Sequence, residues 1–161
     1  MFKVLNLKIL FTTFIYVLLL VSPLSSPFAS EAETSNIKPS FAVFSLNDSF
    51  HELSKSKVRM IYKGKVNRLN KINIALIDWG ESSRYKATFY RALLGKSLSQ
   101  MNGYRASLAF SGKGNLPSTI KNNDLNSIVE WLTSNPNGIA YAPTNTLPSN
   151  SNILFVLIQG E

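Results

Sequence analysis

The chain contains no cysteine and only one histidine among its 161 residues. The absence of cysteine excludes a disulfide, a thiolate zinc site, an iron–sulfur cluster and a cysteine nucleophile. A single histidine, His51, excludes a metal site built from several imidazoles. Nothing in the sequence pairs His51 with a serine and an orienting acid, as a serine nucleophile requires. We therefore predict neither a bound metal nor a cofactor.

Acidic residues are scarce as well. Nine Asp and Glu stand against seventeen Lys and Arg, which gives a net charge of +8. The few carboxylates are spread thinly, so the sequence offers no candidate pair for glycoside hydrolysis, and we predict that the protein is not an enzyme. The positive charge favours an anionic partner: nucleic acid, an anionic surface or a small oxyanion.

Apolar runs are short, and the most conspicuous one lies near the N-terminus. Lys3 and Lys8 precede a run of about a dozen apolar residues that ends at Val21, whereas a membrane span needs about 20. Small residues then fit a cleavage site ending at Ala32, with Ala29 as an alternative. This pattern is typical of a secretory signal.

We therefore predict a cleavable signal peptide at residues 1–32 and a single domain at residues 33–161. Cleavage would remove two basic residues and one acidic residue, leaving 15 and 8, a net charge of +7. The positive charge therefore belongs to the domain. An exported, cysteine-free protein is typical of the bacterial envelope, and we expect it in the periplasm.

The hydrophobic pattern predicts an α/β fold with a small mixed sheet covered by helices. Two aromatic residues, Phe110 and Trp131, are expected in the core because each accompanies an apolar helix stripe. Ser97 and Gln100 form a capping-box pattern at the start of one helix. Strands are predicted at 41–44, 72–77, 139–142 and 153–158, and helices after Ser54, Ser83, Ser97 and either Asn123 or Asp124.

A dense basic segment occupies residues 55–71. It contains seven basic residues and no acid: Lys55, Lys57, Arg59, Lys63, Lys65, Arg68 and Lys71. Such density could follow the phosphates of a nucleic acid, or it could face solvent or an anionic partner. Because export makes nucleic acid an improbable partner, we predict none.

The turn between the strand at 72–77 and the next helix is the better candidate site. A helix start exposes unpaired N–H groups and the positive end of the helix dipole, which suit an oxyanion. Ser82 and Ser83 supply hydroxyls there, and Arg84 and Lys86 supply positive charge. The residues alone leave open whether Ser83 merely caps the helix.

Four stretches of the chain resemble a known family, in the order and spacing found there. They are Leu53–Lys65, Ser83–Ser97, Tyr104–Gly114 and Asn135–Tyr141. Their patterns are similar to "LS…IF.GK", "S..R..FY..VLGKS", "YW..L.F.GKG" and "NPGAIGY" in compact, single-lobe relatives of phosphate ABC-transporter substrate-binding proteins. Tyr62 stands in place of a phenylalanine and Arg105 in place of a tryptophan. The resemblance covers nearly all of residues 40–142.

This resemblance implies one lobe of a type 2 periplasmic-binding-protein fold and a non-enzymatic role in binding phosphate or a similar oxyanion. Ser82, Ser83, Arg84 and Lys86 would be the ligand contacts, with Ser83 as the helix-start donor. The implied partners are a transporter permease or another envelope protein. The alternative is an envelope interaction module that has lost ligand binding and uses the basic face at 55–71. The oligomeric state is left open.

Overall fold

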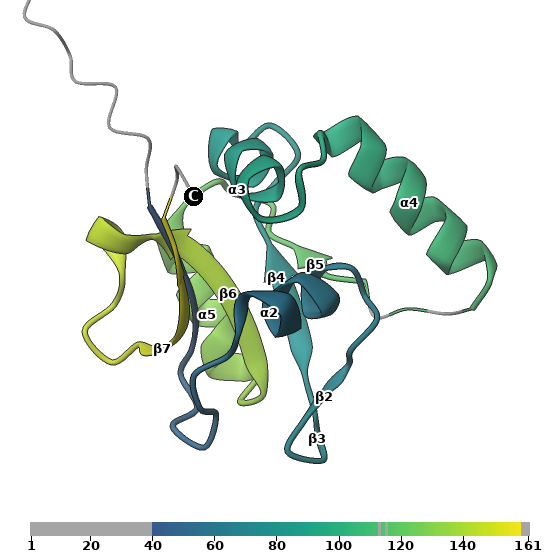
Figure 1. Ribbon diagram of the computed structural model, residues 1–161. Helices are drawn as coiled ribbons and strands as arrows, with labels where there is room; N and C mark the ends of the chain where they lie inside the picture. The colour runs from purple at the N-terminus through teal and green to yellow at the C-terminus, as the bar shows by residue number, and fades with distance from the viewer. Residues whose placement is uncertain (1–39, 113, 115, 159–161) are drawn as a thin grey trace, which may run out of the picture. The chain divides into compact units, whose positions relative to one another are not determined.

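Five strands form a mixed sheet in the computed structural model, which describes residues 40–112, 114 and 116–158 (Figure 1). The strand order is β5-β4-β6-β1-β7. β4 is parallel to β5 and β6, whereas β1 is antiparallel to β6 and β7. The strands are β1 (Phe41–Ser45), β4 (Ala75–Asp78), β5 (Ser118–Thr119), β6 (Gly138–Pro143) and β7 (Asn152–Leu157). The predicted α/β class with a small mixed sheet is confirmed.

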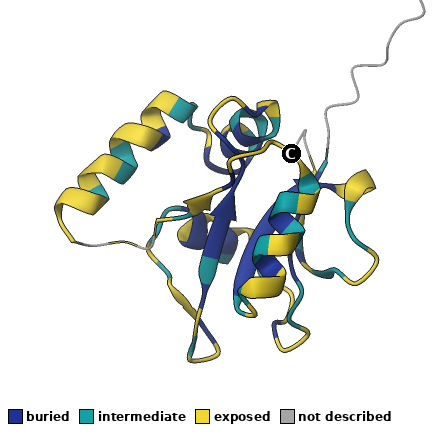
Figure 2. Ribbon diagram, turned by 180° about the vertical axis from the view of Figure 1, so that it is seen from behind, coloured by how far each residue is buried: buried dark blue, intermediate teal, exposed yellow. Residues whose placement is uncertain are grey.

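Helices cover both faces of this sheet. α2 lies on the face towards the viewer in Figure 1, and α5 lies on the opposite face, as Figure 2 shows from behind. The predicted caps Ser54, Ser83 and Ser97 each accept a hydrogen bond from a backbone N–H in the first turn. Of the two candidates for the last helix, Asn123 and Asp124, it is Asp124 that does so. The helices are α2 (Lys55–Tyr62), α3 (Arg84–Leu94), α4 (Leu98–Phe110), α5 (Leu125–Ser134) and the short 3₁₀ turn η1 (Thr144–Thr146).

Aromatic rings dominate the core between the sheet, α2 and α3. Phe89 of α3 stacks on Tyr141 of β6, with ring centroids 3.6 Å apart. Tyr62 of α2 meets both rings edge-on, with centroids 4.9 Å from Phe89 and 5.7 Å from Tyr141. Edge contacts of this kind stabilise beyond the area that they bury. The packing holds α2 and α3 firmly over the middle of the sheet.

The strand predicted at 72–77 is two elements. Asn70 and Lys71 both have positive φ (48° and 69°), and they turn the chain between β2 (Arg68–Leu69) and β3 (Ile72–Asn73). β2 and β3 form a separate antiparallel hairpin, and β4 starts only at Ala75. The prediction was wrong here because no glycine or proline marks Ile74, where the chain passes from the hairpin to the main sheet.

Phe110 is also not where the sequence predicted it. Its side chain is 99% exposed, whereas Met101 of the same helix is fully buried. Nine residues separate the two, so at about 100° per residue they lie on opposite sides of α4. Trp131 is half-buried and packs against the margin of the core. The prediction was therefore wrong for Phe110, and Trp131 contributes only at the edge.

The predicted signal peptide, residues 1–32, lies outside the described residues, so it stays a prediction. The same holds for the domain boundary at residue 33. Within the described part of the chain, no helix has the length and apolar character needed to cross a membrane.

Candidate functional site

Asp78, the last residue of β4, is the centre of a buried polar cluster. Its Oδ1 accepts a hydrogen bond from the Tyr141 hydroxyl at 2.5 Å, and its Oδ2 accepts one from the Tyr90 hydroxyl at 3.0 Å. Arg105 Nη1 donates to the same Oδ2 at 3.0 Å, and Lys86 Nζ lies 3.4 Å from it. Asp78 is fully buried. A buried carboxylate is tolerated because cations and hydroxyls surround it.

The cluster is assembled from four elements. Asp78 ends β4, Tyr90 and Lys86 come from α3, Arg105 comes from α4 and Tyr141 comes from β6. β4 and β6 are parallel, so their carboxyl ends meet at the same edge of the sheet. In open α/β sheets this edge is where ligands usually bind.

Lys86 is shared between this cluster and the surface. Its Nζ donates to Glu81 Oε1 at 2.5 Å, and its side chain is 1% exposed while that of Glu81 is 60% exposed. Asn102 of α4 donates to the other Glu81 oxygen at 3.3 Å. The hydrogen bond from Lys86 is the main reason why the pKa of Glu81 lies below its ordinary value of 4.5. A buried ammonium is thus held by a carboxylate that reaches solvent.

Three buried tyrosines line the cluster. Burial, reinforced by the negative charge of Asp78, raises the pKa values of Tyr62, Tyr90 and Tyr141 well above their ordinary 10.0. They therefore stay neutral and keep their hydroxyl protons. Tyr90 also accepts a hydrogen bond from Arg105. The hydroxyl of Tyr62 has no partner among the described residues, although that side chain is buried.

The four predicted site residues lie on one turn but in different surroundings. Ser83 is buried and caps α3, because its Oγ accepts from Tyr85 N at 3.2 Å. Ser82 is exposed, and its Oγ accepts from Asn123 Nδ2 at 2.8 Å. Arg84 is exposed over the Tyr85 ring. Lys86 is buried rather than open to solvent.

Sequence reasoning missed Asp78, Tyr90, Arg105 and Tyr141 as members of a common cluster. One signal was present: Asp78 is an acid that directly follows the apolar strand residues Ala75-Leu76-Ile77. Its partners lie 12 to 63 residues further along the chain, so their spacing indicated nothing. His51 is exposed, and no group of three or more potential metal ligands occurs in the described ranges.

Comparison with solved structures shows what this fold is similar to. An ABC-type phosphate transport receptor from Vibrio cholerae matches with a TM-score of 0.55 and 12% identity, over 73% of this chain and 47% of the receptor. The fold of this chain is similar to part of that receptor. A protein assigned as a phosphate ABC transporter substrate-binding protein from Clostridium perfringens, solved with bound phosphate, matches with a TM-score of 0.52 and 15% identity, over 73% and 45%.

The chain spans a little under half the length of these two structures. No protein-family model and no curated protein matches it. The likeness to these two receptors is therefore one of fold, and it is consistent with the single-lobe relation that the sequence resemblance implied.

Proposed function

We propose that the protein is an exported, non-enzymatic binding protein for phosphate or a similar oxyanion, which is held at the start of α3 by Ser82, Ser83, Arg84 and Lys86. α3 is 11 residues long and has no acid in its first turn. Its N-terminal end therefore carries a partial positive charge that no acid within the first turn of the helix offsets. The fold likeness to phosphate receptors supports the same class of ligand.

The contact between Lys86 and Glu81 is the observation that carries the proposal. The ammonium of Lys86 is buried, but the carboxylate on it is 60% exposed and is otherwise held only by Asn102, at 3.3 Å, among the described residues. A phosphate oxygen offers the same acceptor chemistry as a carboxylate oxygen and more negative charge. Glu81 thus occupies the position of an oxyanion, and an incoming anion would replace it.

The two serines keep the capacity to donate. Ser83 Oγ accepts from Tyr85 N, and Ser82 Oγ accepts from Asn123 Nδ2, so both hydroxyl protons remain available for an anion. Arg84 would add charge at the exposed rim. Binding would consist of hydrogen bonds and charge attraction, without covalent chemistry. We propose a periplasmic location and a transporter permease or another envelope protein as the partner.

One observation favours the alternative, an envelope interaction module that has lost ligand binding. The carboxylate of Asp78 already accepts hydrogen bonds from Tyr90, Tyr141 and Arg105, and it also lies against Lys86. These donors are therefore satisfied by the protein itself. Under this alternative the cluster is a structural feature that ties α3 and α4 to the sheet.

Calorimetric titration with phosphate and with sulfate separates the two functions. We expect saturable phosphate binding that Ser83→Ala weakens about 10- to 100-fold, because a hydrogen bond to a charged group contributes about 1.5–3 kcal/mol. Glu81→Gln should strengthen binding, since it removes the charge of the competing carboxylate. Ser97→Ala, which removes the equivalent cap from α4, is the control. The absence of binding in every variant would support the interaction module.

A further inference from the structure

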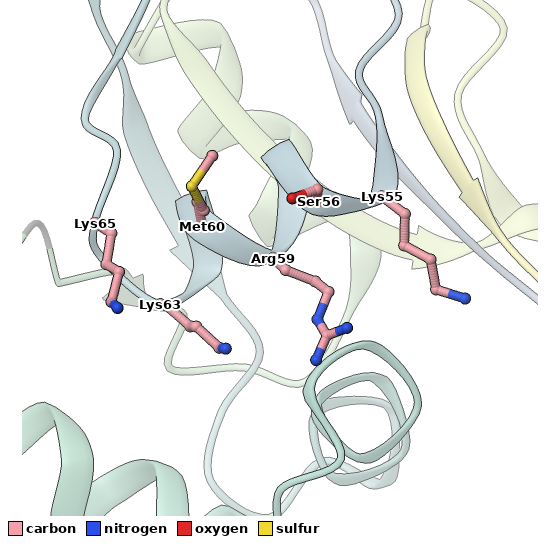
Figure 3. Close-up of a pocket in the computed structure, with 6 residues that line it drawn as sticks. All are labelled: Lys55, Ser56, Arg59, Met60, Lys63 and Lys65. Carbon is pink, nitrogen blue, oxygen red and sulfur yellow. The ribbon is translucent and has the colours of Figure 1, made fainter.

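A second basic region lies on α2, apart from the α3 turn. Six residues line a pocket of about 460 Å³, which we call the α2 basic pocket: Lys55, Ser56, Arg59, Met60, Lys63 and Lys65. Figure 3 shows that the charged ends of its four cations extend away from the helix, while Met60 adds an apolar contact. No acid lines this pocket.

The positions of these cations follow from the helix. Lys55, Arg59 and Lys63 recur every four residues, so they follow one side of α2, whereas Val58, Ile61 and Tyr62 are buried on the other side. At a rise of about 1.5 Å per residue, the row extends about 12 Å from Lys55 to Lys63. Lys65 continues it beyond the helix end.

This positive charge is not balanced within the described part of the protein. Every ion pair there involves Lys86 or Arg105, so none reaches the four cations of the α2 basic pocket. The first turn of α2 has no acid and begins with Lys55, which opposes the helix dipole. A bound anion would relieve both the mutual repulsion and this unfavourable placement.

We propose that the α2 basic pocket binds an anion that carries several phosphate groups along a chain. A row of about 12 Å is too long for one orthophosphate to contact throughout, but an oligophosphate can follow it. Charge-assisted hydrogen bonds from Lys and Arg are the usual means of holding phosphate oxygens. The anion is either free or displayed on a lipid headgroup, which presents the same chemistry.

Calorimetry with tripolyphosphate at about 0.15 M salt tests this proposal on the full chain. We expect a saturable site that the triple variant Lys55→Gln/Arg59→Gln/Lys63→Gln weakens at least tenfold and that Ser83→Ala leaves unchanged. The matched control, Arg91→Gln/Lys96→Gln/Lys121→Gln, removes the same charge elsewhere and should change the affinity less than about threefold. Circular dichroism verifies that both variants are folded.

A second arm identifies the source of the phosphates. The protein is mixed with vesicles that contain a lipid with a bisphosphorylated headgroup. If it binds them only when the α2 basic pocket is intact, and tripolyphosphate displaces it, the anion is displayed on a lipid. Tripolyphosphate binding without vesicle binding indicates a free one.

Three outcomes would overturn the proposal. The first is equal weakening by both triple variants, because the effect would then depend on net charge alone. The second is displacement of tripolyphosphate by an equal concentration of orthophosphate. The third is tighter binding of a single-stranded oligonucleotide that strengthens with its length, which would indicate a nucleic-acid surface.

Discussion

The tyrosines around Asp78 show that a buried hydroxyl can either stabilise or destabilise the folded state. Tyr141 donates to Asp78 at 2.5 Å, whereas the Tyr62 hydroxyl is buried without a partner among the described residues. A hydrogen bond to a charged group stabilises the folded state. A buried hydroxyl with no partner destabilises it, because the hydroxyl loses its hydrogen bonds to water and gains none in the protein. Two residues with the same side chain thus have opposite effects.

Replacing each tyrosine by phenylalanine tests this difference. Tyr141→Phe should lower the free energy of unfolding by about 1.5–3 kcal/mol, because Asp78 loses a donor. Tyr62→Phe should leave it unchanged or raise it by up to about 3 kcal/mol. Urea unfolding measures both. Equal losses would mean that the Tyr62 hydroxyl has a partner in solution.

Glu81 contributes to the free energy of unfolding in a way that depends on pH. Its pKa in the folded protein lies below the ordinary 4.5, mainly because Lys86 donates to it. The contact therefore stabilises the fold above about pH 4.5, and this stabilisation is lost as the pH falls through the lower folded-state pKa.

Unfolding curves recorded from about pH 7 to about pH 3 should show this loss. Wild type is expected to lose more stability over this range than Glu81→Gln, which has no proton to bind at this position. Glu130→Gln, in an exposed position on α5, is the control and should follow wild type. The same pH dependence in all three proteins would show that the Lys86 contact contributes nothing.

At the scale of elements, the sequence correctly predicted those features that depend on residues close together along the chain. The helix starts at Ser54, Ser83 and Ser97 were found, and the last one was narrowed to Asn123 or Asp124, because a cap and its N–H donor lie within three residues of each other. The division of the strand at 72–77 was missed because no glycine or proline marks Ile74, which separates β3 from β4.

The candidate site was only partly predictable for the same reason. Ser83 was correctly placed at a helix start, since that feature is local. Lys86 was expected to supply positive charge at the turn, but it is buried and its ammonium lies 3.4 Å from Asp78 at the end of β4. The partners Arg105 and Tyr141 belong to elements distant in sequence, which only the sheet and helix packing bring to Asp78.

Two phenylalanines test the arrangement of α3 and α4. Phe89→Ala should lower the free energy of unfolding by about 3–5 kcal/mol, because the ring is fully buried and stacks on Tyr141. Phe110→Ala should change it by less than about 0.5 kcal/mol, since that ring is exposed. Denaturant melts provide both values. A large loss for Phe110→Ala would indicate that α4 packs through its other side.

At the scale of the whole molecule, the two candidate anion sites differ in whether their cations are paired with carboxylates. Asp78 and Glu81 hold Lys86 and Arg105 at the α3 turn, whereas the cations of the α2 basic pocket form no ion pair within the described residues. A net charge of +8 attracts anions to both regions over a long range. Long-range attraction does not determine which of the two regions binds phosphate. The binding position depends on hydrogen-bond donors that converge on the anion at short range.

The most direct test of the central claim, that phosphate binds at the start of α3, is amide NMR during a phosphate titration. The backbone amides of Ser82, Ser83, Arg84 and Lys86 should shift in a saturable way at one common affinity, together with the side-chain amide of Asn123, which contacts Ser82. Amides of the α2 basic pocket should move far less with orthophosphate. Saturable shifts confined to that pocket, or no saturable shift at all, would contradict the account.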